Sequence, residues 1–565
     1  MCCLLIRSFQ LLYLLLFLLN FQAYLSSCSS SITQLCSPEV AAALIQFKTS
    51  FSIIKDSSWK CDESYPKTNS WKEGSDCCSW DGVACDSIKG QVIGLDLSCS
   101  QLYGSIPSNS SLFHLPHLQK VNLAFNDFQF SKMSSKFRRF ASLVYLNLSN
   151  TYLAGQVPSQ ISHLSKLVSL DLSGNYYQPL DRHTLEGLVQ NLTEVRHLFL
   201  NDINMSSVHP NALMNLSSSL RTFNLNYCDL RGKFPKNIFH LPNLKSLYLA
   251  DNINLTLYIP KLNRSSNLEI LDLSFVSSSM ELMDSIGNLV SLKHLVLYGA
   301  NLMGSIPRPL WNLVSLEYLN LGNSNLSGSI PRSLRNFTQL CYLDLSGNYF
   351  SGQIPSSLTN LRQLEFLSIS HNQLEGSIPD ALPNLISLHL SFNLLNGTLP
   401  SWLYTVCTMK QIYLNDNKLS GDIKEFQCKS LEKISLGNNK LKGPLPSSIF
   451  QLVNLSTADF SHLSGIVHIN MFSKLQNLQY LDLSYNNLSL NSNGTSVDYV
   501  FPNLRYLLLS SCNVNELSRF LKGSKSLQYL DLSNNKIYGK IPKWMWDVGK
   551  DYAALEFISQ LFYRF

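Results

Sequence analysis

Large apolar residues return at a nearly fixed interval along most of the chain, with polar residues between them. In the most regular stretch, the first leucine of a Leu-x-Leu triplet recurs every 24 residues, at Leu247, Leu271, Leu295, Leu319 and Leu343. In an extended segment the two leucines point to one side and the residue between them points to the other. Each triplet therefore predicts a short strand with its leucines buried and its intervening side chain facing outward.

The interval between triplets indicates the architecture. Leucine-rich patterns with this period are typical of leucine-rich repeat solenoids, which stack repeats instead of enlarging one core. We predict an α/β-type solenoid superhelix of about 19 repeats over residues 91–546, with a parallel concave sheet. The first-strand residues are Leu95, Val121, Leu146, Leu170, Leu198, Phe223, Leu247, Leu271, Leu295, Leu319, Leu343, Leu367, Leu388, Ile412, Ile434, Ala458, Leu481, Leu507 and Leu530.

Two further positions of the repeat predict structure. An asparagine five residues after the first-strand residue can satisfy backbone groups that the following turn buries. It occurs at Asn126, Asn175, Asn252, Asn348, Asn372, Asn393, Asn417, Asn439, Asn486 and Asn535. A Gly-x-Ile-Pro motif follows in several repeats, for example at Gly304–Pro307, Gly352–Pro355 and Gly539–Pro542. Glycine permits a bend and proline favours extended backbone, so we expect a second short strand there.

Residues 32–90 precede the regular repeats and predict an N-terminal cap. Ser37 followed by Pro38 is a helix start, with a capping hydroxyl and proline in the first turn. The helix would present one apolar face, made by Val40, Leu44, Phe47 and Phe51. We expect this face to pack against Trp71 and Trp80 and to close the open end of the solenoid core.

The first residues predict entry into the secretory pathway. Arg7, an apolar run from Leu11 to Leu19 and small residues near Ala23 indicate a signal peptide over residues 1–27. A retained signal anchor is the alternative, but the apolar run is short for a bilayer span. No later stretch of the sequence is apolar enough over about 18 residues to predict a membrane helix.

Cysteine usage fits an oxidising compartment. The cysteines near the N-terminus are dense enough to predict a disulfide-stapled cap, and they are Cys36, Cys61, Cys77, Cys78, Cys85 and Cys99. Cys228 and Cys512 take the place of the repeat asparagine, so we expect buried free thiols there. Cys407 and Cys428 could pair or remain free.

Composition and motifs argue against several classes of function. The net charge of +6 over 565 residues is too small for a nucleic-acid-binding surface. The sequence has no nucleophile motif, no phosphate-binding glycine loop and no metal-spaced cluster, so we expect no enzyme activity, no cofactor and no metal. Asn-x-Ser/Thr sequons suggest glycosylation at Asn109, Asn147, Asn191, Asn204, Asn215, Asn254, Asn263, Asn325, Asn336, Asn396, Asn454, Asn487 and Asn493.

Specific cap motifs resemble a known family. Asp76–Cys85 reads DCCSWDGVAC, and with the Gly-x-Ile-Pro repeats it resembles the plant-specific class of leucine-rich repeats. Tyr65–Thr68 and Cys99–Leu102 narrow the resemblance to the plant receptor-like proteins of the Cf type, which confer resistance to fungal pathogens. The resemblance implies an immune receptor without a kinase, which senses pathogen-derived proteins or peptides and signals through partner receptor kinases. It also implies disulfides Cys36–Cys77 and Cys78–Cys85, which leaves Cys61 and Cys99 for each other.

The repeat pattern decays near the end of the chain. Residues 547–565 lack the Leu-Ser-x-Asn that should follow a strand, so we interpret them as an irregular tail after a truncation. Family members continue into a membrane helix, and membrane attachment would then need a segment missing from this chain. We expect a cell-surface location on the extracellular side if that segment exists, and the apoplast otherwise.

Outward residues beside the triplets are the candidates for ligand contact. Aspartates recur there at Asp171, Asp272, Asp344, Asp482 and Asp531, and we interpret them as solvated structural positions. Departures from the recurrent pattern are better candidates, because exposed aromatic residues and arginine are favoured at binding hot spots. They are Arg196, His197, Phe199, Arg221, Asn224, Tyr248, Lys293, His294, Val296, Tyr298, Tyr318, Phe366, His389, Gln411 and Tyr413.

Two functions fit these features. The first is the ligand-binding ectodomain of an immune receptor-like protein. The alternative is a soluble secreted inhibitor or decoy that binds a microbial cell-wall hydrolase. For any single candidate residue, scattered tyrosine and histidine on a long surface remain an alternative explanation.

Overall fold

The computed structural model describes residues 36–260, 266–278, 285–463, 466–489, 501–514, 521 and 524–537. The predicted signal peptide and tail, Asn263, Asn493 and the motif at Gly539–Pro542 lie outside the described residues. The chain divides into two compact units. We call residues 36–302 and 307–313 the N-terminal unit, and residues 303–306 and 314–537 the C-terminal unit.

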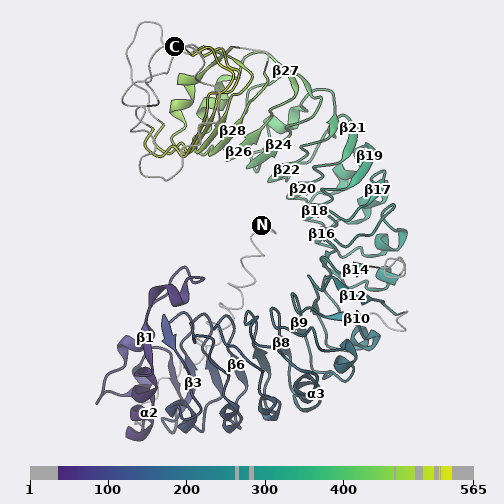
Figure 1. Ribbon diagram of the computed structural model, residues 1–565. Coiled ribbons are helices and arrows are strands. Elements are labelled where there is room, and N and C mark those ends of the chain that lie inside the picture. The colour runs from purple at the N-terminus through teal and green to yellow at the C-terminus, as the bar shows by residue number, and fades with distance from the viewer. Residues whose placement is uncertain are drawn as a thin grey trace. The chain divides into compact units, whose positions relative to one another are not determined.

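A parallel ladder of short strands runs through the N-terminal unit (Figure 1). The strands are β3 (Val92–Asp96), β5 (Lys120–Asn122), β6 (Tyr145–Asn147), β7 (Ser169–Asp171), β8 (His197–Phe199), β9 (Thr222–Asn224), β11 (Ser246–Tyr248), β13 (Ile270–Asp272) and β15 (His294–Val296). Each predicted first-strand residue is paired with the next one, from Leu95 with Val121 to Leu271 with Leu295. The predicted strand positions and register are therefore confirmed in this unit.

The C-terminal unit contains a second ladder of the same kind. Its strands are β16 (Tyr318–Asn320), β18 (Tyr342–Asp344), β20 (Phe366–Ser368), β22 (Ser387–His389), β24 (Gln411–Tyr413), β26 (Lys433–Ser435), β28 (Thr457–Asp459), β30 (Tyr480–Asp482), β32 (Tyr506–Leu508) and β33 (Tyr529–Asp531). Leu367 pairs with Leu388 although their repeat has only 21 residues. The ladder thus keeps its register when the rest of a repeat shortens.

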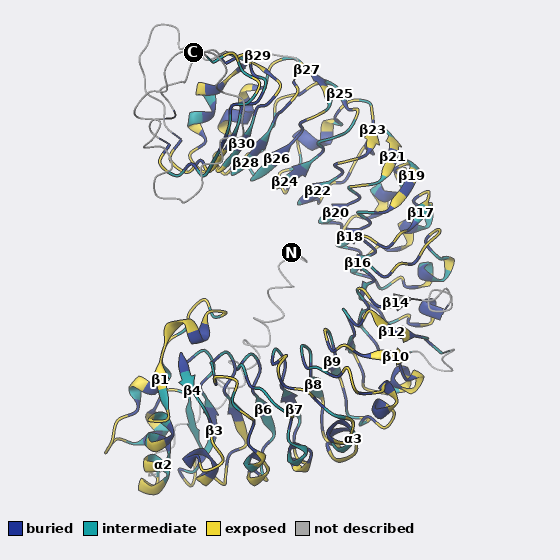
Figure 2. Cartoon of the chain, viewed as in Figure 1, coloured by how far each residue is buried: buried dark blue, intermediate teal, exposed yellow. Residues whose placement is uncertain are grey.

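Helices lie opposite the ladders and enclose the core of each unit (Figure 2). The 3-10 helices of the repeats were not predicted. They are η4 (Ser111–His114), η5 (Ser135–Arg139), η6 (Ser159–His163), η7 (Pro210–Leu213), η8 (Lys236–His240), η9 (Ile286–Asn288), η10 (Arg308–Asn312), η11 (Arg332–Asn336), η12 (Ser356–Asn360), η13 (Ser401–Tyr404), η14 (Ser447–Gln451) and η15 (Ile469–Lys474). One longer helix, α3 (Arg182–Asn191), takes this place after β7. Leucine is the most frequent residue among the buried side chains of the described chain.

Second strands form in many repeats, with boundaries shifted from those predicted, whereas the motif at Gly304 makes only an isolated bridge with Leu326. They are β10 (Arg231–Lys233), β12 (Asn254–Leu257), β14 (Ser277–Ser278), β17 (Ser327–Gly328), β19 (Tyr349–Gln353), β21 (Gln373–Gly376), β23 (Leu394–Leu395), β25 (Ser420–Asp422), β27 (Lys440–Lys442), β29 (Ile466–His468) and β31 (Asn487–Ser489). They end before the Ile-Pro pair of the motif. Instead, Pro307, Pro331 and Pro355 are the residues that cap the next 3-10 helix, a place where the missing N–H of proline costs nothing.

The asparagines form the predicted spine. Each accepts a backbone N–H of the preceding repeat and donates to carbonyls of both its own and the preceding repeat, as Asn126 does with Leu102, Leu123 and Leu97. The free thiols of Cys228 and Cys512 are buried, as predicted. Their Sγ atoms lie 3.1 Å and 3.0 Å from carbonyls of the preceding repeat, so each thiol keeps one bond of the asparagine that it replaces.

The cap begins with α2 (Pro38–Lys48), whose first turn is capped by the Ser37 hydroxyl. The placement of Phe51 on this helix was wrong. The helix closes at Thr49, and Phe51 begins β1 (Phe51–Ile53), antiparallel to β4 (Leu102–Gly104). Backbone pairing with the first repeat therefore determines the conformation at Phe51, although its ring still contacts Phe47 at 5.0 Å between centroids.

The remaining cap elements are η1 (Lys55–Ser58), η2 (Lys67–Ser70), η3 (Cys77–Ser79) and β2 (Val83–Cys85), which runs antiparallel to β3. The rings of Trp71 and Trp80 stack at 5.5 Å. Lys48 at the end of α2 donates to the Trp71 carbonyl, which joins the helix to this pair.

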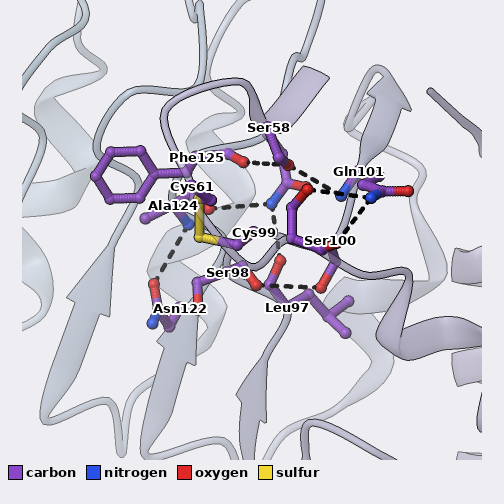
Figure 3. Close-up of a disulfide and its surroundings, with 12 residues drawn as sticks. Ser58, Cys61, Leu97, Ser98, Cys99, Ser100, Gln101, Asn122, Ala124 and Phe125 are labelled. Carbon is purple, nitrogen blue, oxygen red and sulfur yellow. Dashed lines mark hydrogen bonds between the residues drawn. A yellow bond between two sulfur atoms is a disulfide. The ribbon is translucent and has the colours of Figure 1, made fainter. Parts of the chain in front are cut away.

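Disulfides Cys36–Cys77 and Cys78–Cys85 are present, as the family resemblance implied. Cys61 and Cys99 also form a disulfide (Figure 3). A fourth disulfide, Cys407–Cys428, joins successive repeats of the C-terminal unit and answers the question that the sequence left open. The sulfur atoms of Cys36, Cys77 and Cys78 lie within 4.8 Å of one another, but all three are disulfide-bonded and offer no thiolate to a metal. Within the described ranges, no helix is both long and apolar enough to span a bilayer.

Candidate functional site

Five aromatic rings form a continuous row on the outward face of the C-terminal ladder. We call Tyr318, Tyr342, Phe366, His389 and Tyr413 the ring ladder. Tyr318 and Tyr342 stack at 4.0 Å with 9° between their planes, and Tyr342 and Phe366 stack at 4.2 Å with 3°. The row continues from Phe366 to His389 at 5.1 Å and from His389 to Tyr413 at 4.6 Å.

Strand register explains this row. Tyr318, Tyr342 and Phe366 occupy the same position of paired strands, so their side chains lie one strand spacing apart. In the next strand that position is Ser387, which is too small to continue the stack. His389, two residues further on, takes its place diagonally and passes the row on to Tyr413.

The stacking determines what the ring ladder offers to a ligand. All five side chains are half-buried. Because neighbouring rings cover the faces of Tyr342 and Phe366, the exposed parts are ring edges and tyrosine hydroxyl groups. Ring edges carry partial positive charge and accept the face of another aromatic ring or an oxygen atom.

His389 is the histidine of the ring ladder, and its surroundings shift its pKa strongly. Its Nε2 is buried and has no hydrogen-bond partner among the described residues. Burial first, and the charge of Lys433 second, lower the pKa of His389 to about 4. The ring is therefore neutral at any pH well above 4.

This shifted pKa predicts a pH-dependent stability. The unfolded chain binds a proton on His389 near pH 6.5 and the folded chain only near pH 4, so stability is fully present above pH 6.5 and falls as pH drops through this window. We expect a loss on the order of 2 kcal/mol between pH 7 and pH 4.5 in urea unfolding. His389→Gln should flatten this slope, whereas His114→Gln, at an exposed position, should not. An unchanged slope in His389→Gln would show that other groups control the acid response.

The other candidates lie on the outward face of the N-terminal ladder. Arg196, Arg221 and Lys293 are exposed, and the remainder are half-buried: His197, Phe199, Asn224, Tyr248, His294, Val296 and Tyr298. Two contacts organise this face. His197 Nδ1 lies 3.2 Å from the Thr222 hydroxyl, and the Tyr298 ring meets Phe275 edge-on at 5.3 Å.

The candidates thus fall on two separate units. Tyr318, Phe366, His389 and Tyr413 are brought together in the ring ladder, and Gln411 shares β24 with Tyr413. Sequence reasoning missed Tyr342 in the middle of the row. The signal that could have found it is its position, one residue before Leu343, which matches that of Tyr318 before Leu319.

The interpretation of the recurrent aspartates as solvated positions was wrong in part. Asp171 and Asp272 are half-buried, and each accepts hydrogen bonds from the backbone and hydroxyl of the serine two residues later. Burial raises the pKa of both carboxyl groups. These aspartates therefore hold the turn after each strand.

The sequons lie almost entirely away from the ladders. Asn147 is the exception among the described strands of the ladders; it is half-buried in β6 and donates to the Tyr145 hydroxyl. Asn204 is half-buried outside the ladders. The other described sequon asparagines are exposed: Asn109, Asn191, Asn215, Asn254, Asn325, Asn336, Asn396, Asn454 and Asn487. Glycans at these positions would leave the ring ladder uncovered.

Comparison with known families agrees with this architecture. The leucine rich repeat N-terminal domain model matches residues 40–86. Leucine rich repeat models match residues 315–374 and the shorter segments 142–164, 219–241, 384–405, 430–452, 477–496 and 526–548. The predicted fold class is therefore confirmed by both structure and family models.

Similar proteins narrow the family. Receptor-like protein 6 of Arabidopsis thaliana is 42% identical over 557 residues, which cover 92% of this chain and 52% of that protein. Receptor-like protein Cf-9 of Solanum pimpinellifolium is 40% identical over 293 residues, which cover 50% of this chain and 33% of that protein. The chain belongs to the plant leucine-rich-repeat receptor-like proteins of the Cf type. The chain spans about half the length of the Arabidopsis relative, and its match to Cf-9 covers about a third of that protein.

Solved structures resemble this receptor-like protein in fold. The TDR receptor is 25% identical with a TM-score of 0.57, and the alignment covers 84% of this chain and 85% of the TDR chain. The plant peptide hormone receptor RGFR1, solved in complex with RGF2, is 26% identical with a TM-score of 0.54 and coverage of 83% and 85%. Leucine-rich-repeat receptor ectodomains of this kind are in general binding modules without catalytic activity.

Proposed function

We propose that this receptor-like protein is the ligand-binding part of a plant cell-surface immune receptor. Its ladder faces bind a pathogen-derived protein or peptide on the extracellular side, and partner receptor kinases transmit the signal. The observation that carries the proposal is the ring ladder, an organised aromatic row on an outward face. Four disulfides support an oxidising, extracellular setting.

The ring ladder has the physical properties of a binding hot spot. Aromatic side chains bring a large contact area with few rotatable bonds, and tyrosine adds a hydrogen-bonding hydroxyl. Stacking between Tyr318, Tyr342 and Phe366 restrains the rings before a ligand arrives. A preorganised surface loses less conformational entropy on binding, so more of the contact energy appears as affinity.

Similar structures support the choice of ligand and partner. The Arabidopsis receptor kinase HAESA, solved in complex with the peptide hormone IDA and the co-receptor SERK1, is 26% identical with a TM-score of 0.51. The alignment covers 90% of this chain and 87% of that one. By analogy, a peptide on the ladder face and a kinase co-receptor fit the present fold, and the similarity to receptor-like protein Cf-9 is our ground for proposing a pathogen-derived ligand.

Alanine at both Tyr342 and Phe366 should remove most ligand affinity. The purified chain would be immobilised and challenged with fractions of apoplastic fluid from infected leaves, and the binding protein or peptide purified. We expect the double variant to bind that ligand at least about 100-fold more weakly, since hot-spot truncations cost about 2 kcal/mol or more each. Binding is measured by biolayer interferometry.

Tyr349→Ala is the matched control. Tyr349 lies on β19, outside the ladder, and is 55% exposed. The Tyr349→Ala variant should bind the ligand with the affinity of the unmodified chain. Equal affinity of the ladder variant and the control would contradict the proposal. Inhibition of a microbial polysaccharide hydrolase by the purified chain, without dependence on the ring ladder, would favour the inhibitor function instead.

A further inference from the structure

We propose that Arg196, His197 and Arg221 form an anion-binding subsite on the N-terminal ladder face, which holds a carboxylate group of an acidic peptide segment. The inference rests on the proposed function, because it assigns a chemical class to part of the ligand. It concerns a different unit from the ring ladder, and the two can be tested apart.

The two arginines are neighbours by register. Each lies two residues before a first-strand residue, Leu198 or Phe223, on the paired strands β8 and β9. The Arg221 amide donates to the Arg196 carbonyl at 2.7 Å, and the Thr222 amide donates to the same carbonyl at 2.9 Å. The side chains therefore leave the backbone about one strand spacing, roughly 4.8 Å, apart.

Neither guanidinium group has an ion-pair partner among the residues that the structure describes. The next repeats show the contrast at the same position: Lys245 pairs with Glu269, with 2.5 Å between Nζ and Oε1. Like charges on adjacent strands destabilise a sheet. Two neighbouring unpaired arginines are thus an electrostatic cost to the free protein, and a bound anion would remove it.

His197 adds a third polar group to this cluster. It is half-buried, directly follows Arg196 and pairs with Thr222, the residue after Arg221, with Nδ1 near the Thr222 hydroxyl. Burial, then Arg221, then Arg196 lower the pKa of His197, which shows that the positive potential of both arginines converges on this ring. The nearest carboxylate on the preceding strand, Asp171, already accepts two hydrogen bonds from Ser173.

The chemistry of the cluster selects an oxyanion. Guanidinium groups present a planar fork of donors that fits a carboxylate, and they are less strongly hydrated than ammonium groups. Phe199, Asn224 and Tyr248 occupy the next outward position along the paired strands β8, β9 and β11. Their apolar and amide groups suit a peptide. Lys293 takes the same repeat position just before β15, on the far side of the Lys245–Glu269 ion pair.

Fluorescently labelled hexaglutamate is the probe, used with the whole chain at low salt. We expect saturable binding by anisotropy that weakens as salt rises, because the contact is electrostatic. Arg196→Gln with Arg221→Gln should weaken binding at least about tenfold. The charge-matched control is Arg138→Gln with Arg139→Gln, two exposed adjacent arginines on η5, and it should bind as before.

A second readout reports on the site itself. Hexaglutamate should raise the pKa of His197 in histidine-selective NMR, since a carboxylate would offset the potential of the arginines. Equal losses in the two double variants, absence of binding, or an unchanged His197 would overturn the subsite. Arginine-dependent binding of hexagalacturonate without binding of hexaglutamate would also overturn it, in favour of an acidic sugar. Tyr342→Ala with Phe366→Ala should leave hexaglutamate binding intact, so failure of the ring ladder would not imitate failure of this subsite.

Discussion

Asn175→Ala will destabilise the N-terminal unit by about 3 kcal/mol or more, because it removes several buried hydrogen bonds at once. Asn175 is 1% exposed, and its Oδ1 accepts from the amides of Thr151 and Leu153. Its Nδ2 donates to the carbonyls of Leu148 and Leu172 at 2.8 Å and 2.9 Å. Alanine offers a hydrogen bond to none of these four backbone groups. Urea unfolding measures the loss.

Hydrogen exchange locates the effect. The amides of Thr151 and Leu153 should lose protection in the variant before the amides of the surrounding strands do, because they lose their acceptor directly. Asn211→Ala is the control, since Asn211 is exposed at the start of η7 in the same unit. A cost for Asn175→Ala no larger than that of Asn211→Ala would refute the role of the asparagine spine.

Removal of the Cys61–Cys99 disulfide, by serine at both positions, should cost about 4 kcal/mol. The bond closes a loop with a sequence separation of 38, and the entropy that it removes from the unfolded chain grows with loop length. In the folded chain it ties the segment after η1 to the first repeat, beside hydrogen bonds from Ser58 to the Phe125 carbonyl and from Cys99 to the Ala124 carbonyl (Figure 3). Urea unfolding under oxidising conditions gives the value.

The Cys78–Cys85 disulfide provides an internal comparison. Its sequence separation is 7, so serine at both positions should cost about 2 kcal/mol by the same relation. The reverse order of the two costs would show that local contacts, and not loop closure, determine what these disulfides contribute to the cap.

Repetition explains why so much of the fold was predictable. A strand position repeated in every turn of the solenoid leaves little choice of register, because a slip of one residue would expose every leucine. The asparagine spine followed from the same logic, since each turn buries the same backbone groups. Even Ala458, the small residue among the first-strand positions, is fully buried in its strand between Ile434 and Leu481.

Features that depend on one particular neighbour were not predictable. Phe51 fits a helical spacing, but pairing of β1 with β4 overrides that local preference. Cys407 and Cys428 are 21 residues apart in sequence, and only the stacking of successive repeats brings them within bonding distance. The half-burial of Asp171 likewise depends on the turn that its serine partner closes.

By itself the sequence determined the repeat, the strand register, the buried leucines, the asparagine spine and the cap with its cysteines, since each is a local pattern that stacking multiplies. Only the tertiary structure decided how the outward side chains meet. In the ring ladder, Ser387 is small, and His389 continues the row in its place. The two arginines stay without an ion pair among the described residues because Glu269 pairs with Lys245 and not with either of them. Such arrangements arise from side chains on adjacent repeats, about 24 residues apart in sequence and one strand spacing apart in space.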